Sequence, residues 1–341
     1  MATVPAAVAC AALLAVACGG PDRMLVVHSS LPDEVNDYAE EAFEEARPDV
    51  DVRMVAVGPE ETLKRLRSGE PQAIDVWWGA PGTVLAHAAE EGLLSRYRPD
   101  WAGDSVLDDP DEELWHPSLM SPFVMAFNRD SLSLGQAPRD WIDMFHFRFR
   151  GEVALPDPAA SGPMAHFIGA MLVEQLRGGG DLAAAFDWLL RLDASVADYV
   201  RDPADLLRRL RSGDALVTIL PRHVAEAARH GDAPWLHYRF PESGAPVLTR
   251  GIAIPAGSSA PQLARAFVDI AGTAGVVTTA MLHTRWTPAR RDLEAPELPE
   301  DFQLDLPWTP RPPATDTLAA ELTDWLRRWE AEVRGRGRSF F

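Results

Sequence analysis

The sequence predicts an α/β protein, because short apolar runs alternate with amphipathic segments along almost the whole chain after residue 20. The 341 residues are enough for about two domains of ordinary size. Both cysteines, Cys10 and Cys18, lie close to the N-terminus, so the folded body contains no cysteine. We therefore expect an α/β body of about two domains that does not depend on disulfides.

The first hundred residues predict three strands, each followed by a helix. The strands are expected at residues 24–28, 50–57 and 74–78, where apolar and β-branched residues follow one another. After the first strand, apolar residues recur at helical spacing until Arg47-Pro48 ends the pattern. The next two helices are expected at 60–68 and 82–91. Beyond the N-terminus, no window is long and apolar enough to cross a membrane.

The rest of the chain repeats this alternation. We expect strands at 152–155, 215–220 and 247–254, and helices at 162–177, 182–192, 260–272 and 273–282. The Pro-rich stretch from Pro288 to Pro313 is neither helix nor central strand and is expected to follow the surface. A last helix carries one apolar stripe, which we interpret as packing on the protein, with a membrane-surface helix as the alternative: Leu318, Leu322, Trp325, Leu326, Trp329 and Val333.

The N-terminus is typical of an export signal. An apolar run from Val4 to Ala17 is too short to span a bilayer comfortably, and small residues then precede Cys18-Gly19-Gly20. This pattern resembles a bacterial lipoprotein processing site, so residues 1–18 are expected to be a signal peptide with Cys18 as the lipidated residue. Ala15 stands where a larger aliphatic residue is usual, and no basic residue precedes the run. An ordinary cleaved signal remains the alternative.

The charge balance disfavours nucleic acid as a partner. The formal net charge is −19, and no basic stripe interrupts it. An anionic ligand must therefore be neutralised by local groups, because the overall field repels it. We expect the lipid anchor to be the one contact of this protein with a membrane. We also expect the protein to be monomeric.

A candidate anion site follows the predicted strand at 152–155. Ser161 is placed to cap the next helix, and Pro163 suits the first turn of that helix. Ala159, Ala160 and Gly162 have little or no side chain, which leaves backbone N–H groups open to a ligand. The alternative is a well-capped turn with no ligand.

Two further strand ends share this design. Ser29 and Ser30 follow the first predicted strand, and Ser30 with Asp33 fits the spacing of a capping box. Trp78-Gly79-Ala80 follows the third strand, and glycine permits close approach of a ligand to the backbone. Since open α/β sheets bind ligands at the carboxyl ends of their strands, we expect these segments to line a site, with Trp78 facing it.

Six segments together resemble the extracellular solute-binding proteins of ABC importers, in the branch that contains ferric-iron, phosphonate and sugar-phosphate binders. The resemblance covers residues 24–285 and is most specific in the run Asp157–Gly162. The segments occur in the family's order: Val26–Ser30, Ile74–Gly79, Ser121–Asn128, Ala137–Trp141, Ala154–Pro163 and Arg250–Ile254.

This resemblance implies a type 2 periplasmic-binding-protein fold of two α/β lobes joined by crossing hinge strands. One lobe would contain residues 24–122 and 251–341, including the C-terminal helix, and the other residues 123–250. It implies capture of a solute between the lobes for delivery to an ABC transporter permease, outside the cytoplasm. It also implies which residues surround the cleft: Ser29, Ser30, Gly79, Ala80, Ser121, Ser161 and Gly162.

The expected ligand is a small anion bearing phosphate, phosphonate or carboxylate. Arg222 follows one strand end and Arg250 begins another, and a guanidinium can bind such groups through two hydrogen bonds. Surface arginines are the alternative at both positions. Ferric iron is the alternative ligand, but the family's adjacent tyrosines are replaced here by Arg222-His223. No cofactor, resident metal or catalytic residue is expected, and an enzyme or receptor-linked sensor remains the weaker hypothesis.

Overall fold

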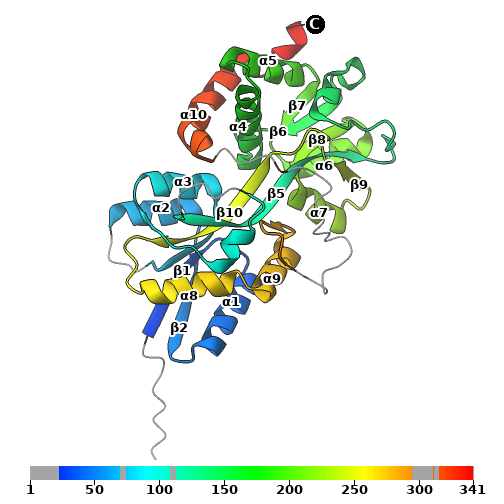
Figure 1. The fold of residues 1–341 in the computed structure, drawn as a ribbon. Coiled ribbons are helices and arrows are strands. Elements are labelled where there is room, and N and C mark those ends of the chain that lie inside the picture. The colour runs from blue at the N-terminus through cyan, green and yellow to red at the C-terminus, as the bar shows by residue number, and fades with distance from the viewer. Residues whose placement is uncertain (1–22, 70–73, 108–112, 294–309, 311–314, 341) are drawn as a thin grey trace, which may run out of the picture.

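Two long strands join two lobes in the computed structural model, which describes residues 23–69, 74–107, 113–293, 310 and 315–340. These strands are β5 (Trp115–Asn128) and β10 (Val247–Pro255), which pair antiparallel and run from one lobe into the other (Figure 1). The expected signal peptide at 1–18, with Cys18, lies outside the described residues. So does most of the Pro-rich stretch 288–313.

One mixed sheet runs through both lobes in the order β2-β1-β3-β10-β5-β8-β6-β7. In the first lobe, β1 (Arg23–Ser29) pairs in parallel with β2 (Val50–Ala56) and β3 (Val76–Pro81). In the second, β6 (Val153–Pro156) pairs in parallel with β7 (Val196–Val200) and β8 (Val217–Pro221). Short strands lie beside these: β4 (Leu94–Ser95), β9 (Leu236–Arg239) and β11 (Thr287–Pro288). The predicted pair of α/β lobes with crossing strands is confirmed.

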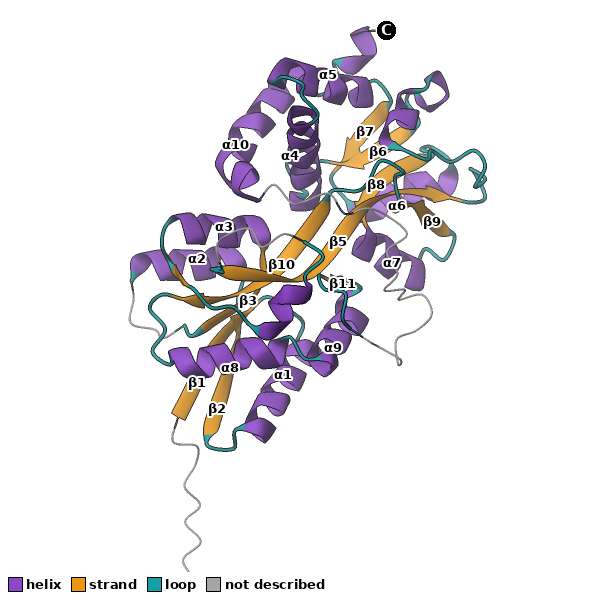
Figure 2. Ribbon diagram, in the orientation of Figure 1, coloured by secondary structure: helices purple, strands orange, loops and turns teal. Residues whose placement is uncertain are grey.

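Helices lie on both sides of the strands in each lobe (Figure 2). The first lobe has α1 (Asp33–Ala46), α2 (Pro59–Ser68), α3 (Gly82–Glu90), α8 (Pro261–Ala271) and α9 (Ala274–Thr284). The second has α4 (Gly162–Arg177), α5 (Leu182–Asp193), α6 (Pro203–Ser212) and α7 (Arg222–His230). The sequence did not predict β7, α6 or α7, because these elements are short and rich in polar residues.

The hinge strand β5 changes from one core to the other along its length. Leu119 belongs to a core with Phe43, Trp78 and Phe267 of the first lobe. Phe123, four residues later, belongs to the core of the second lobe. Since every residue of β5 is buried, the strand forms a continuous connection through the molecule.

The C-terminal helix α10 (Thr315–Glu332), which we expected in the first lobe, packs buried side chains into the core of the second lobe and also contacts α3 of the first lobe. Trp325 and Trp329 belong to that lobe's core, and α10 lies beside α4 (Figure 1). A Cβ added at Gly169 of α4 would lie 2.5 Å from Leu318 Cδ2, which shows how closely the helices approach. An apolar stripe predicts that a helix is packed but does not indicate which lobe it packs on.

No single described helix meets the length and hydropathy needed to span a bilayer, although α8 and α9 meet them jointly across a bend of 65°. Phe267 of α8 and Val276 of α9 lie in the first lobe's core.

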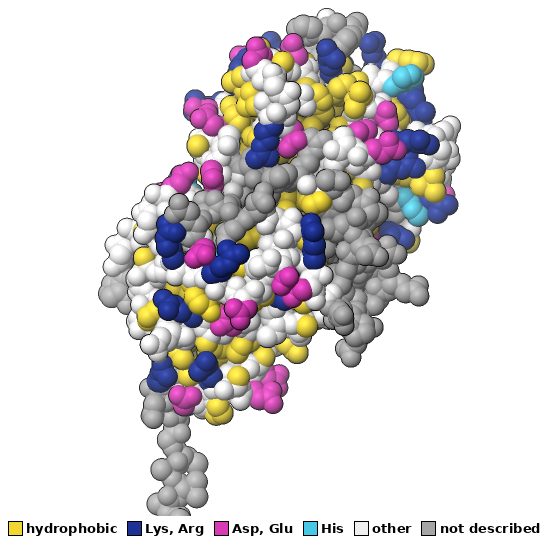
Figure 3. All heavy atoms as spheres, viewed as in Figure 1, with side chains coloured by type: hydrophobic (Ala, Val, Ile, Leu, Met, Phe, Trp, Pro, Cys, Tyr) yellow, Lys and Arg dark blue, Asp and Glu magenta, His cyan; other side chains and the backbone are white. Residues whose placement is uncertain are grey.

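Figure 3 shows basic and acidic side chains interspersed over the face in view.

If α10 is part of the second lobe's core, truncating its buried tryptophan should destabilise the protein. We expect Trp329→Ala to lower the free energy of unfolding by about 3–5 kcal/mol, because a large buried side chain leaves a cavity. Asp324→Ala on the same helix removes a side chain that is 68% exposed and should change it by less than about 0.5 kcal/mol. Urea unfolding followed by far-UV circular dichroism measures both, and equal effects would contradict this packing.

Candidate functional site

The carboxyl ends of β1 and β3 meet at Ser30 and Gly79. The Ser30 N–H donates to the Trp78 carbonyl at 3.1 Å, and the Ser30 hydroxyl donates to the Gly79 carbonyl at 2.7 Å. Gly79 has a φ of +79°, and a Cβ there would lie 2.7 Å from Leu31 Cγ, so the turn requires glycine. Ser29 is buried, and its Oγ accepts the Leu31 N–H at 3.1 Å.

The expected capping box at Ser30 is wrong. Helix α1 begins at Asp33 with Pro32 as its N-cap residue and has no side-chain cap. The Ser30 hydroxyl instead bonds to Gly79, a contact across the sheet that local sequence spacing does not reveal. Ser30 therefore ties two strand ends together.

Arg250 on β10 extends its guanidinium to the same two strand ends. Its Nη1 lies 3.0 Å from the Gly79 carbonyl and 3.3 Å from the Ser30 carbonyl, and the guanidinium carbon lies 5.0 Å from the centre of the Trp286 ring. Burial lowers the pKa of Arg250. Among the described residues, no carboxylate is paired with this guanidinium. Arg250 is thus a desolvated cation with neutral partners.

Ser121 and His223 lie beside this cation and connect the lobes. Ser121 Oγ accepts the His223 N–H at 3.2 Å and lies 2.8 Å from His223 Nδ1. The His223 ring, from α7 of the second lobe, stacks on Trp286, which precedes β11, with centroids 4.4 Å apart. Burial, together with the Arg250 charge, lowers the pKa of His223 to about 3, so the imidazole is neutral at pH 7.

Arg222 is buried, so the surface alternative for this residue is wrong. Its Nη1 donates to Thr287 Oγ1 at 3.0 Å and its Nε donates to the Tyr238 hydroxyl at 3.2 Å. The Tyr238 hydroxyl donates in turn to the Glu226 carboxylate. Arg222 therefore joins α7 to β11 through a polar network.

The start of helix α4 is built as predicted in one respect and differently in another. Ser161 caps the helix by accepting the Met164 N–H at 3.3 Å. The amides of Ala159 and Ala160 are not free as expected, because the former donates to the Asp157 carboxylate and the latter to the Asp157 carbonyl, both at 2.9 Å. The donors that remain are the Ser161 hydroxyl and the Gly162 N–H.

A cavity of about 260 Å³ adjoins this helix start. Most of its wall is apolar and comes from the second lobe, including Phe123, Ala160, Ser161, Gly162, Pro221 and Val224. Ser30 is not among its lining residues. The expectation that Ser30 and Ser161 face one solute therefore stays a prediction.

Trp78 and Ala80 do not line an open site, contrary to expectation. Trp78 is 2% exposed and packs edge-on against Phe267 with ring centroids 5.7 Å apart, while Ala80 is fully buried. Strand β3 has helices on both faces, so its side chains are buried in both directions, Trp77 included. At this strand end, the Gly79 carbonyl is the group that contacts Ser30 and Arg250.

Sequence reasoning missed Trp286 and Thr287, and it named His223 only as one of the two residues that stand where the family has adjacent tyrosines. No motif marks these residues, since they meet Arg250 and Arg222 only after the chain folds. Within the described part of the chain, no three His, Cys, Asp or Glu side chains are grouped to hold a metal ion.

Buried neutral histidines should make the solute-free protein sensitive to acid. Burial lowers the pKa of His28 and of His166 to about 4, and that of His223 to about 3, from an ordinary value of 6.5. Below pH 6.5 the unfolded chain gains protons that the folded chain does not. The stability that these neutral histidines contribute is therefore fully present above pH 6.5 and is lost as the pH falls towards 4 and 3.

We expect the melting temperature of His223→Gln to fall less steeply between pH 6.5 and pH 4 than that of the wild type. The His87→Gln variant is the control, because the His87 side chain is 41% exposed, and it should retain the wild-type slope. Differential scanning calorimetry measures the profiles, and identical slopes for all three proteins would disprove a buried neutral His223.

The comparisons with known proteins agree with this architecture. Residues 25–275 match the model of a family described as bacterial extracellular solute-binding protein. A relative from Sinorhizobium fredii, named as a probable ABC transporter periplasmic-binding protein, is 28% identical over 291 residues, which are 83% of this chain and 80% of the relative.

Solved structures show the same fold at low identity. The Trichodesmium protein FutA, in complex with iron and citrate, superposes with a TM-score of 0.77 at 12% identity, covering 90% of this chain and 98% of FutA. The periplasmic binding protein AfuA of Actinobacillus pleuropneumoniae, with fructose-6-phosphate bound, superposes with a TM-score of 0.67 at 21% identity, covering 92% of this chain and 99% of AfuA. The predicted type 2 periplasmic-binding-protein fold is confirmed. This chain belongs to the bacterial extracellular solute-binding protein family, which makes it an extracytoplasmic binding protein and not an enzyme.

Proposed function

We propose that this solute-binding protein captures a small anionic solute between its lobes and delivers it to an ABC importer. The proposal that the solute is an anion rests on the positive charge of Arg250, which has no carboxylate partner among the described residues. The importer is supported by the name of the Sinorhizobium relative. The solute class is supported by the sugar phosphate bound to AfuA and the citrate bound to FutA.

Arg250 has the donors that an oxyanion needs. Of its three nitrogens, only Nη1 donates to protein atoms in the described residues, which leaves Nε and Nη2 to bind a phosphate or carboxylate through two hydrogen bonds. Burying an unpaired charge costs free energy, and an arriving anion removes that cost. The His223 ring is neutral and adds no charge of either sign, while the Trp286 ring covers the Arg250 guanidinium through a cation–π contact.

The second lobe contributes a complementary anion site at the start of α4. The Ser161 hydroxyl and the Gly162 N–H lie at the positive end of a 16-residue helix, where anions are stabilised. A solute that contacts this helix start and Arg250 together would hold the lobes closed, since the open form lacks half of these contacts. Ligand capture and recognition by the importer would then depend on one equilibrium.

Ferric iron is less well supported. The tyrosines of this chain are separated in the fold, since Tyr97 donates to Asp269, Tyr199 to Asp193 and Tyr238 to Glu226. A cation near His223 would also meet the charge of Arg250. We include in the proposal that Cys18 carries a lipid anchor and that the mature protein is monomeric, both on the grounds of the sequence.

Removing the positive charge of Arg250 should weaken the binding of an anionic solute. We expect Arg250→Met to weaken binding of an anionic solute by about 1.5–3 kcal/mol, the contribution of a hydrogen bond to a charged group. Arg265→Met removes an exposed arginine of the first lobe and should leave the affinity unchanged. Isothermal titration calorimetry with the anion that most raises the melting temperature measures both, and equal affinities would argue against Arg250 as the anion contact.

A charge reversal at the helix start should block binding without unfolding the helix. In Ser161→Asp the new carboxylate can still cap α4, but it repels an anion, so we expect binding to weaken by at least about tenfold while the melting temperature is retained. Ser161→Thr keeps both the cap and the hydroxyl and is the matched control. Wild-type affinity in the aspartate variant would exclude this helix start from the site.

A further inference from the structure

The turn that presents Ser161 is organised by a single residue, Asp157. The carboxylate accepts the Ala159 N–H at 2.9 Å, and the Asp157 carbonyl accepts the N–H groups of Ala160 and Ser161 at 2.9 and 2.8 Å. These three bonds fix the path of the chain into α4. The direction in which the Ser161 hydroxyl and the Gly162 N–H point therefore depends on where Asp157 is held.

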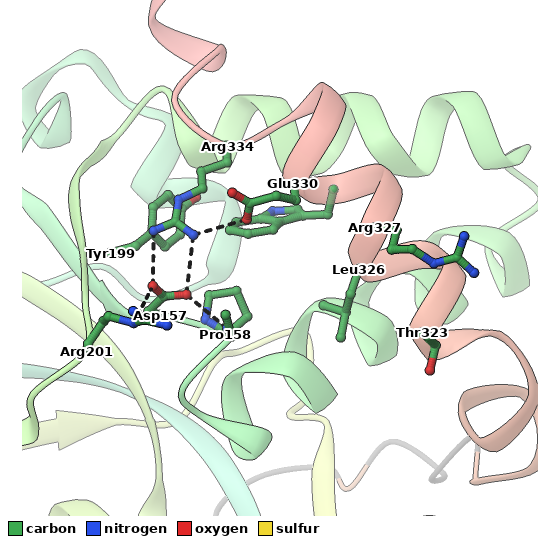
Figure 4. A pocket seen from close by; sticks show the side chains of 11 residues that line it. Asp157, Pro158, Tyr199, Arg201, Thr323, Leu326, Arg327, Glu330 and Arg334 are labelled. Carbon is green, nitrogen blue, oxygen red and sulfur yellow. Dashed lines mark hydrogen bonds and ion pairs between the residues drawn. The ribbon is translucent and has the colours of Figure 1, made fainter.

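Asp157 is only 3% exposed and needs compensating charge. Arg334, which follows α10, supplies it through two contacts, Nη2 to Oδ2 at 3.1 Å and Nη1 to Oδ1 at 3.4 Å (Figure 4). Burial alone would raise the pKa of Asp157, but the Ala159 N–H and the Arg334 guanidinium hold it below its ordinary value. Arg201 also approaches, at 3.5 Å, but its side chain is 72% exposed against 30% for Arg334.

Arg334 is itself held in place on the second lobe. Its guanidinium carbon lies 5.3 Å from the centre of the Tyr199 ring, and its Nη1 lies 3.1 Å from Glu330 Oε2. Directly after it, the N–H groups of Gly335 and Gly337 donate to the buried Asp193 carboxylate at 2.9 and 2.8 Å. The guanidinium is thus presented to Asp157 by a fixed segment of backbone.

We propose that Arg334 is a positioning residue for solute binding, which sets the shape of the 157–161 turn from the far end of the chain. Arg334 touches no solute. Its effect passes through the Asp157 carboxylate to the donors at the start of α4, so the proposal rests on the proposed function, in which those donors contact the solute. It also gives the C-terminal segment, which lies beyond the residues of the family match, a role in binding.

The test compares Arg334→Met with Arg327→Met in the full-length protein. Both arginines line a groove between the start of the 157–161 turn and the C-terminal part of the chain from α10 onward. Arg327, however, pairs with Asp324 of its own helix and points away from Asp157 (Figure 4). Hydrogen exchange of the solute-free proteins reports on the turn. We expect the amides of Ala160 and Ser161 to exchange about tenfold faster in the Arg334 variant and at the wild-type rate in the Arg327 variant.

Calorimetric titrations with inorganic phosphate, citrate and fructose 6-phosphate report on binding. For any of these that the wild type binds, we expect about tenfold weaker affinity in Arg334→Met, partial recovery in Arg334→Lys and no change in Arg327→Met. Melting temperatures within a degree or two of each other would show that stability is not the cause.

The outcomes separate the two proposals. Unchanged exchange at Ala160 and Ser161 overturns the role of Arg334, whatever the solutes do. Faster exchange with unchanged affinity overturns its link to binding. A wild-type protein that binds none of the three anions counts against the proposed function, while the exchange result still decides whether Arg334 holds the turn.

Discussion

The proposed binding site depends on the placement of one positive charge, Arg250, where the crossing strands meet the first lobe. A guanidinium removed from water is stable there because backbone carbonyls of Ser30 and Gly79 accept its hydrogen bonds and Trp286 covers it. These neutral groups solvate the charge without cancelling it. The fold therefore keeps one positive charge without a carboxylate partner among the described residues, in a chain whose formal net charge is −19, and the proposed attraction for anions rests on this charge.

The residues around Arg250 come from both lobes. Trp286 and Thr287 belong to the segment after α9, whereas His223 and Arg222 begin α7 of the second lobe. Contacts between them cross the hinge. In the proposed function, a solute changes how the lobes meet, and it can shift that equilibrium only by the difference between its affinities for the two forms.

The fold was largely predictable because hydrophobic periodicity and strand-end chemistry act over short distances. The run from Asp157 to Ser161 predicted a capped helix start correctly, and Arg250 was a candidate from the sequence. Long-range contacts limited the rest: Ser30 bonds to Gly79 instead of capping α1, Trp78 is enclosed by helices on both faces, and α10 contacts both lobes while its tryptophans pack in the core of the second. Trp286 has no local signature at all, since its role arises only when residues distant in sequence come together.

The most direct test of this account compares solutes that differ only in charge. The melting temperature of the purified protein would be measured with matched pairs, such as fructose 6-phosphate and fructose, or citrate and its neutral triamide. The account predicts that at least one anion raises the melting temperature while its neutral partner does not, because a ligand selective for the native state stabilises it. A neutral member that stabilises the protein as much as its anionic partner would contradict the central role of Arg250.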